Sequence, residues 1–429
     1  MGKIAFYLDN RHISQVDCSA VLQGNPGIGG TEYMIIAVSY LLAIRNNGLE
    51  IKTYVRSQGI FPKEYKYEMV DSFVDAVNRA STDGYDYCIF KHEADLISSG
   101  ALDVVDKNIK LIVWDHVFAC YWELDYYAKN PQIYRIVNVG REMNDLYRDH
   151  RVFEKSLFIY NGIDLDGVRE QVEKYPFDKR GNNVVYVGAL VPFKGFHLLA
   201  AAWPEILEKV PDAELYVIGS GKLYDTNAEM GRFGIAERSY EDLFMRYLSK
   251  NDEIIPSVHF MGNMGHDKND ILLQAKVGVP NPSGITETFC ISAVEMQVMG
   301  ELVTTINYPG FMDTIKNGIL YRNKKNLAKN VVRLLKSVNR NYEETMNYFE
   351  KNFSFDAVVS EWEMLLCNRI CGREENMSNP FYRMKWMKEL KRILGKKYPI
   401  FYKLPPIERI LLFLERLYKG PFTYIDSGC

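Results

Sequence analysis

Two glutamates, Glu287 and Glu295, have the spacing to act on one ligand. They follow an apolar run at 277–279, and from about Phe289 onward the apolar spacing predicts a helix. If the whole interval is helical, the carboxylates lie roughly 12 Å apart along the axis on nearly one face. They could then hold two separate sets of hydroxyl groups, while the N–H groups of residues 288 to 290 face an anion. The alternative is a first-turn acid at Glu287 and a solvated helix residue at Glu295.

Glycine-rich turns elsewhere could bring the backbone close to phosphate groups. The stretch 27–32, Gly-Ile-Gly-Gly-Thr-Glu, precedes an apolar helical pattern, Gly188 opens a turn that leads to Lys194, and Gly219 follows another apolar run. Glycine has no Cβ to block such an approach, and a helix N-terminus favours an anion. Lys194 could neutralise phosphate charge. Each feature is equally compatible with an ordinary turn or a solvated lysine.

The segments that must position these residues alternate short apolar runs with amphipathic patterns. This alternation predicts strands joined by helical crossovers in parallel sheets, where ligands bind beyond the carboxyl ends of the strands. His116, with Asp115 before it, stands at such an end. A polar connection at 173–182 separates two sets of strands, expected at 3–8, 50–55, 87–91, 111–114, 133–139 and 156–160, and then at 183–187, 214–218, 258–261, 277–279 and 303–305.

Several motifs, which follow one another along the chain in the order of the family, resemble those of the family 4 retaining glycosyltransferases, also described as glycosyl transferases group 1. The resemblance is carried by Glu287-x7-Glu295, by the Gly29-Gly30 loop, by Asn161-Gly162-Ile163-Asp164, and by Gly188 to Gly195. His116 is similar to the family histidine near the donor sugar. The segment 258–262 resembles the strand whose following loop contacts the base. Phosphate loops of the G-x-x-x-x-G-K-[ST] type and G-x-S-x-G elbows are missing from the sequence.

The resemblance implies an α/β architecture called GT-B, in which two Rossmann-like, doubly wound domains face each other across a cleft. The expected parts are an N-terminal, acceptor-side domain at 1–175, a nucleotide-sugar-binding domain at 182–352, a helix at 353–370 that crosses back to the first domain, and a helical tail at 371–429.

The same resemblance implies transfer of a sugar, with retention and without a metal, from a nucleotide-sugar, UDP- or GDP-linked, to a hydroxyl of a glycan or lipid-linked acceptor. Such a reaction belongs to the synthesis of cell-surface polysaccharide or glycolipid, and it needs no cofactor. The implied catalytic residues are His116, Lys194 and Glu287. The implied donor-binding residues are Gly29, Gly30, Gly188, Lys194, Gly219, Met261, Thr288, Phe289, Cys290 and Glu295.

Departures from the family pattern keep other functions open. Ala189 stands where the family has a phosphate-binding arginine, and Arg141 or Lys91 are candidates to replace its charge. Glu301 stands where a proline is common, and Thr288 and Cys290 replace glycines beside Phe289. The missing arginine leaves a non-catalytic partner that stabilises or localises another glycosyltransferase as the main alternative. An epimerase or phosphorylase on the same scaffold is a further one.

Composition argues against several other classes of protein. The chain has 429 residues, 47% of them hydrophobic, and a formal net charge of −3. This favours two or more packed cores rather than a disordered chain, and it offers no basic excess for nucleic acid. Seven scattered cysteines favour a reducing compartment, and no stretch has the length of a membrane span. We therefore expect a cytoplasmic protein.

The last part of the chain differs in charge from the rest. Residues 381–429 hold 11 Lys and Arg against 4 Asp and Glu, a net charge of +7. Two stretches, 383–394 and 407–418, combine apolar and basic residues at helical spacing. A basic amphipathic helix can lie on an anionic membrane surface, which would place the protein peripherally on the inner face of the plasma membrane. The alternative is that these helices pack on the body of the protein or on a second subunit.

Overall fold

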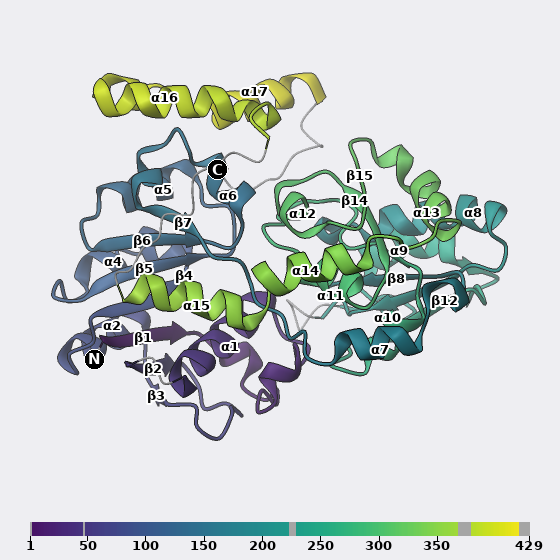
Figure 1. Cartoon of the computed structure of the whole chain (residues 1–429), viewed down its shortest axis with the longest axis horizontal. Helices are drawn as coiled ribbons and strands as arrows, with labels where there is room; N and C mark the ends of the chain where they lie inside the picture. The colour runs from purple at the N-terminus through teal and green to yellow at the C-terminus, as the bar shows by residue number, and fades with distance from the viewer. Residues whose placement is uncertain (1, 46–47, 223–228, 368–378, 420–429) are drawn as a thin grey trace. The chain divides into compact units, whose positions relative to one another are not determined.

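The computed structural model describes residues 2–45, 48–222, 229–367 and 379–419. The chain divides into two compact units (Figure 1). Unit 1 comprises the described parts of residues 1–19, 31–162 and 356–429, and unit 2 comprises those of 20–30 and 163–355. The division at Gly162 and Ile163 falls in the Asn-Gly-Ile-Asp turn. The segment 173–182, expected to connect two domains, lies within unit 2.

Unit 1 is built on a seven-stranded parallel sheet in the order β3-β2-β1-β4-β5-β6-β7. The strand order reverses between β1 and β4, so loops diverge there and leave room for a ligand. The strands are β1 (Gly2–Leu8), β2 (Leu49–Val55), β3 (Tyr67–Met69), β4 (Tyr87–Lys91), β5 (Lys110–Asp115), β6 (Ile133–Asn138) and β7 (Ser156–Phe158).

Helices cover this sheet. They include α1 (Gly30–Ile44), α2 (Phe73–Thr82), α3 (Ala94–Ser98), α4 (Ala101–Val104), α5 (Tyr121–Lys129) and α6 (Arg141–Leu146). The long helix α15 (Phe355–Leu366) belongs to unit 1 from Asp356 onward, although it follows unit 2 in the sequence. Trp362 of α15 packs edge to face on Trp114 of β5, with ring centroids 4.7 Å apart, and both rings are fully buried. This contact anchors α15 to the sheet.

Unit 2 has a six-stranded parallel sheet in the order β12-β9-β8-β13-β14-β15. The strands are β8 (Asn183–Val187), β9 (Glu214–Ile218), β12 (Val258–Gly262), β13 (Val277–Gly278), β14 (Leu302–Ile306) and β15 (Gly318–Tyr321). Its helices include α7 (Val168–Lys174), α8 (Phe196–Lys209), α9 (Arg238–Leu248), α10 (Lys268–Gln274), α11 (Ile291–Val298), α12 (Pro309–Thr314), α13 (Leu327–Leu335) and α14 (Tyr342–Asn352).

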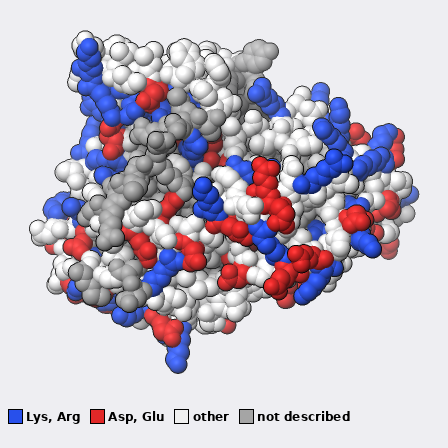
Figure 2. All heavy atoms as spheres, in the orientation of Figure 1, with Lys and Arg blue, Asp and Glu red and all other residues white. Residues whose placement is uncertain are grey.

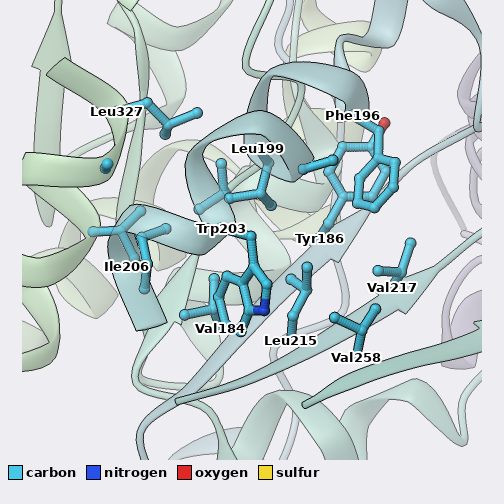
Figure 3. Close-up of a cluster of buried hydrophobic side chains, with 14 of the residues drawn as sticks. Val184, Tyr186, Phe196, Leu199, Trp203, Ile206, Leu215, Val217, Val258 and Leu327 are labelled. Carbon is cyan, nitrogen blue, oxygen red and sulfur yellow. The ribbon is translucent and has the colours of Figure 1, made fainter. Parts of the chain in front are cut away.

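The core of unit 2 shows why these segments fold together. Phe196, Leu199 and Trp203 of α8 point onto strands β8 and β9, where Val184 and Leu215 lie beneath them (Figure 3). All five side chains are fully buried. Helix residues at spacings of three and four share one face, and burying that face on a sheet is the main driving force for this layer.

Every strand expected from the sequence is present, with ends shifted by at most two residues. The short strands β3, β10 (Ser249–Lys250), β11 (Glu253–Ile254) and β15 were not expected, because edge and two-residue strands carry little apolar signal. The thiols of Cys18, Cys88, Cys290 and Cys367 are free. Cys120 is disulfide-bonded, which the scattered cysteine spacing did not indicate.

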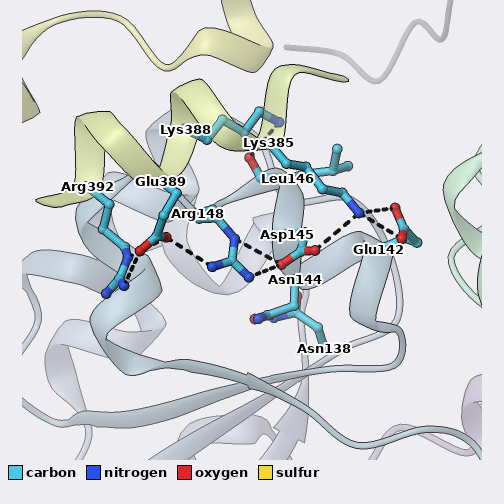
Figure 4. Close-up of polar contacts among 10 residues, drawn as sticks. All are labelled: Asn138, Glu142, Asn144, Asp145, Leu146, Arg148, Lys385, Lys388, Glu389 and Arg392. Atoms are coloured by element: carbon cyan, nitrogen blue, oxygen red, sulfur yellow. Dashed lines mark hydrogen bonds and ion pairs between the residues drawn. The ribbon is translucent and has the colours of Figure 1, made fainter. Parts of the chain in front are cut away.

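The tail forms α16 (Lys385–Lys397) and α17 (Ile407–Lys419), which belong to unit 1. Ion pairs join α16 to α6 and to the residues that follow it (Figure 4). One side of the tail therefore packs on the body of the protein, as one of the two arrangements weighed from the sequence predicts, and contact with a membrane stays a prediction. Within the described residues, none of the helices combines the length and the apolar character required to cross a bilayer.

Candidate functional site

Lys194 and Glu287 form an ion pair in unit 2. The Nζ atom of Lys194 lies 2.9 Å from Oε2 of Glu287. Asn281 donates a second hydrogen bond, also of 2.9 Å, from Nδ2 to the same carboxylate oxygen. The side chain of Glu287 is 9% exposed and that of Lys194 is 19% exposed, so this polar group is largely shielded from water. The structure thus brings together two residues predicted for the site and adds Asn281.

Close contact between two loops, one that carries Lys194 and one that leads to Glu287, positions this pair. Lys194 ends a short 3-10 helix, and Gly195 follows with a φ of +71°. A Cβ on Gly195 would come within 2.6 Å of the backbone N of Ser283, so only glycine allows the loops to approach so closely. The hydroxyl of Ser283 donates a hydrogen bond to the carbonyl of Phe193. The loop that carries Lys194 is therefore fixed against the loop that leads to Glu287.

The helix after Glu287 begins later than the sequence predicts. Helix α11 starts at Ile291, and Cys290 is its N-cap, so Glu287 is not at the helix entrance. The carbonyl oxygen of Glu287 accepts a hydrogen bond of 3.2 Å from the N–H of Gly310, in α12. That tertiary bond takes the place of a helical one, and apolar spacing cannot signal it. The axial distance expected for a continuous helix between Glu287 and Glu295 therefore does not apply.

The other carboxylate, Glu295, lies on α11 and pairs with Lys268. Its Oε1 is 2.9 Å from Nζ of Lys268, which begins α10. The side chains are 14% and 8% exposed, respectively, so the pair is largely buried. Lys268 was missed from the sequence, because a single lysine before a short helix has no distinctive pattern. What marks Lys268 as unusual is that a lysine is buried, and burial is known only from the tertiary structure.

Gly188 and Gly219 lie at the carboxyl ends of β8 and β9, where the two backbones touch. Gly219 has a φ of +139°, and a Cβ there would fall 2.0 Å from the carbonyl oxygen of Gly188. Ala189 is buried, and the hydroxyl of Tyr186 donates to its carbonyl oxygen over 3.1 Å. Met261, near the end of β12, is 40% exposed. Glycine is thus required at the turn where the resemblance predicts a phosphate contact.

The residues between Glu287 and α11 are buried rather than turned to solvent. Thr288, Phe289 and Cys290 have exposed fractions between 4% and 7%. Burial raises the pKa of the Cys290 thiol above its usual range, and the nearby Glu287 adds to this effect. Cys290 is therefore a neutral packing residue at the start of the helix and not a thiolate nucleophile.

The glycine loop before α1 is shaped by Asn25. The Oδ1 atom of Asn25 accepts hydrogen bonds of 2.9 Å from the N–H groups of Gly27 and Ile28, and its Nδ2 donates to the carbonyl of Ile28. Gly30 is the first residue of α1, with Gly29 immediately before it. A Cβ on Gly30 would lie 3.3 Å from Cδ1 of Ile291, at the start of α11. Within unit 2, the loop thus reaches the start of α11.

In unit 1, His116 follows β5 beside the ring of Trp114, with centroids 4.9 Å apart. Burial, together with the charge of Lys91, lowers the pKa of His116 to about 3. Its imidazole is therefore neutral at physiological pH and can exchange hydrogen bonds without carrying charge. Asp115 is fully buried, and burial raises the pKa of its carboxyl to about 7.

A pocket opens in unit 1 where the strand order reverses. It is lined by Asp9, Arg11, His12, Lys91 and Glu93, residues at or beyond the carboxyl ends of β1 and β4. Lys91 lies 3.1 Å from Glu32 and 3.3 Å from Glu93. Charged donors and acceptors are interleaved here, which suits a polyhydroxylated ligand better than an apolar one. Lys91, a candidate to replace the missing arginine, is engaged by two carboxylates of its own unit.

The two parallel sheets and the solved structures that resemble this chain define a protein of the GT-B fold. Anabaena Alr3699/HepE, solved in complex with UDP and glucose, superposes with a TM-score of 0.62 at 14% identity, covering 86% of this chain and 100% of that one. The alpha,alpha-trehalose 6-phosphate synthase of Burkholderia multivorans gives a TM-score of 0.61 at 11% identity, covering 86% and 99%. A glycosyltransferase of Rickettsia africae ESF-5 gives 0.58 at 16% identity, again covering 86% and 99%.

The sequence comparison points to one family over part of the chain. Residues 168–353, which lie within unit 2, match the family model of glycosyl transferases group 1. A curated relative, the phosphatidyl-myo-inositol mannosyltransferase of Mycobacterium tuberculosis, is 24% identical over 162 residues. The match spans 37% of this chain and 37% of the length of that relative. The family signal therefore belongs to the unit that holds Lys194, Glu287 and Glu295.

Proposed function

We propose that the protein is a glycosyltransferase that moves a sugar from a nucleotide-sugar donor to a hydroxyl group of an acceptor, with retention of configuration and without a metal. The observation that carries this proposal is the Lys194–Glu287–Asn281 group in the unit that matches glycosyl transferases group 1. It combines a cation for a diphosphate with a carboxylate for sugar hydroxyls, held by two interlocked loops.

In this proposal the residues of unit 2 divide the donor between them. Glu295 takes the ribose hydroxyls, Glu287 takes hydroxyls of the transferred sugar, and Lys194 takes the diphosphate together with the Gly29-Gly30 loop and the start of α11. When the donor binds, its phosphate replaces the carboxylate of Glu287 as the partner of Lys194. Binding thus exchanges one ion pair for another and frees Glu287 to accept hydrogen bonds from the sugar.

The reaction needs charge stabilisation and placement more than a protein nucleophile. The bond between the anomeric carbon and the diphosphate oxygen breaks, the acceptor oxygen bonds to the same face of that carbon, and the acceptor proton passes to the departing phosphate. Lys194 stabilises the charge that develops on the leaving group. A neutral His116 contacts the sugar near the reacting carbon, and the polar pocket of unit 1 receives the acceptor.

We propose a UDP- or GDP-linked sugar as the donor and a glycan or lipid-linked acceptor, in the synthesis of cell-surface polysaccharide or glycolipid. The complex of Alr3699/HepE with UDP and glucose, and the phosphatidyl-myo-inositol mannosyltransferase, support this choice of ligand classes. A lipid-linked acceptor also fits a cytoplasmic protein that attaches peripherally to the membrane.

The test is a screen of UDP-, GDP-, ADP- and CMP-sugars by thermal shift and by release of the nucleoside diphosphate. One nucleotide should raise the melting temperature by mass action. The Glu287→Gln variant should lose diphosphate release, whereas Glu205→Gln, at an exposed position on α8, should keep it. Release that is unchanged in Glu287→Gln would contradict the assignment.

A second function is favoured by one observation. Ala189 is buried at the position where the family has an arginine, so the unit lacks that second cation. A protein of this kind could stabilise or localise another glycosyltransferase without turning over a donor. If none of the nucleotide-sugars raises the melting temperature or releases its diphosphate, although the protein is folded, this non-catalytic role is favoured.

A further inference from the structure

The tail helix α16 has its cationic face turned inward. Lys385, Lys388 and Lys391, at spacings of three, are at most 9% exposed. Lys385 lies 2.7 Å from Glu142 and 3.2 Å from Asp145 (Figure 4). Lys391 lies 3.0 Å from Asp149. The acidic surface at and after α6 therefore holds the basic face of this helix.

Helix α17 is tied to the same network. Glu408 accepts a hydrogen bond of 2.6 Å from Lys388 and pairs with Arg383. Asp149 also accepts a hydrogen bond of 2.7 Å from the N–H of Ile407, the first residue of α17. Helix α16 thus turns Lys385, Lys388 and Lys391 inward and α17 turns Glu408 inward, while several apolar residues of both helices are exposed.

Large apolar residues of both helices are exposed to solvent, and together we call them the outer apolar face. Its main members are Trp386, Leu390 and Ile393 of α16 and Ile410, Phe413 and Leu417 of α17, with exposed fractions between 45% and 69%. At the top of Figure 2, over α16 and α17, white spheres of uncharged residues predominate, with some blue and red ones beside them. Large apolar side chains that are exposed together, beside polar residues, are typical of a site that contacts another protein or a membrane.

Among the tail side chains that the structure describes, the exposed charged ones are cationic, and one of them, Lys396, pairs with Glu154 of the body. Lys396, Lys397, Lys403 and Arg409 are exposed. The tail carboxylates whose side chains the structure describes, Glu389 and Glu408, both pair with cations: Glu389 with Arg148 and Arg392, and Glu408 with Lys388 and Arg383. The tail therefore presents apolar groups flanked by positive charge, and its described carboxylates offer that surface little negative charge.

We propose that the outer apolar face docks on an anionic lipid bilayer, with α16 and α17 lying in its surface. Apolar side chains enter the boundary of the acyl chains, and the flanking cations meet the anionic headgroups. A second copy of the same face would bring like charges together, which disfavours a symmetric dimer through this surface. The proposal is independent of the transferase reaction, because it concerns where unit 1 sits and not what unit 2 binds.

The sequence predicted a basic amphipathic helix at 383–394 that could lie on an anionic membrane, and the structure buries Lys385, Lys388 and Lys391 of that helix against the protein. The membrane would instead be met by the opposite side of the helix.

The test uses the full chain and vesicles of phosphatidylcholine mixed with phosphatidylglycerol, with pure phosphatidylcholine for comparison. The wild type should cosediment with the anionic vesicles. Leu390→Ser together with Ile393→Ser should weaken this by roughly tenfold or more, since two exposed apolar anchors are lost. A matched control, Val104→Ser with Val338→Ser, removes two apolar residues that are 69% and 57% exposed elsewhere, and it should bind like the wild type.

A second readout is the fluorescence of Trp386, which lies in the outer apolar face. Trp114, Trp203 and Trp362 are fully buried, so in a Trp122→Phe background Trp386 is the exposed one of the remaining tryptophans. Its fluorescence should shift to the blue when anionic vesicles are added. Replacing Lys397 and Lys403 by Glu should weaken binding to anionic vesicles more than binding to neutral ones.

Three outcomes would overturn the proposal. The first is no cosedimentation and no blue shift of Trp386 in a folded protein. The second is equal binding by the Leu390/Ile393 variant and the wild type. The third is a dimer in light scattering that the same variant converts to a monomer, because the face would then be covered by a second copy. Diphosphate release in solution without lipid reports separately on the transferase proposal.

Discussion

The ammonium group of Lys194 and the carboxylate of Glu287 lie 2.9 Å apart, although the residues are separated by 93 positions in the sequence. Asn281 donates to the same oxygen of Glu287. The pair is largely buried, so it contributes to the stability of the fold. In the proposed reaction it is also the state of the donor site before the donor binds. These two roles can be separated by measurement.

Lys194→Met should lower the free energy of unfolding by about 1–3 kcal/mol, because a shielded carboxylate loses a charged partner. It should also lower turnover by about 10²–10³-fold, because the leaving group loses its cation. Adding Glu287→Gln to Lys194→Met should cost little further stability, since the unpaired charge is then gone. Urea unfolding of the two single variants and the double variant measures this coupling. Strictly additive losses would show that the two residues do not interact.

Lys268→Met should act on donor binding rather than on the chemical step. Lys268 holds Glu295 at 2.9 Å, and Glu295 is the residue proposed for the ribose. We expect the KM for the donor to rise by about tenfold with a smaller change in kcat, the pattern of a lost uniform binding interaction. Lys209→Met, on the exposed end of α8, serves as the control. A fall in kcat with an unchanged KM would instead assign Lys268 to the transition state.

His116 should leave no trace in the pH dependence of transfer. Its pKa is lowered to about 3 by burial and by Lys91, so the imidazole is already neutral through the range from about pH 5 to 9. His116→Asn should keep the shape of the kcat/KM profile, even where its amplitude falls. An inflection near pH 6.5 that disappears in the variant would contradict this.

Glu301→Gln should stabilise the protein more as the pH rises. Glu301 is fully buried, and burial raises the pKa of its carboxyl well above the ordinary value of 4.5, although Arg180 opposes the shift. A group with a raised folded pKa contributes stability that is present below pH 4.5 and is lost as the pH rises through the folded value. We expect a gain of about 1–3 kcal/mol at about pH 8 and little gain at about pH 4.5. Denaturant unfolding of both proteins at the two pH values is the check.

Lys385→Met should loosen the tail. Lys385 is 1% exposed between Glu142 and Asp145, and removing one partner of a buried ion pair leaves an uncompensated charge at a cost of about 3–5 kcal/mol. Limited proteolysis should then cut within the tail faster than in the wild type. Lys396→Met is the matched control, because the side chain of Lys396 is half exposed and its pair with Glu154 is worth at most about 1 kcal/mol. Equal cleavage of the two variants would contradict the role of Lys385.

The sequence by itself determined the alternation of strands and helices, and with it both parallel sheets. A strand that is buried on both faces must be apolar along its length, and a helix that covers it must be apolar on one side. The glycines at 195 and 219 also indicated turns in the sequence. In the structure both have a positive φ and lie so close to another backbone that a Cβ would not fit.

Only the tertiary structure decided which partner each charged residue has. Neither Lys268 nor Asn281 belongs to a pattern, since both act across distances that local spacing does not encode. Helix α11 begins at Ile291, and the carbonyl oxygen of Glu287 accepts a hydrogen bond from the N–H of Gly310, a residue outside that helix. The tail shows the same limit, since helical periodicity gives α16 an apolar and a basic face. Which face is buried depends on the acidic surface of Glu142, Asp145 and Asp149, which only folding brings beneath it.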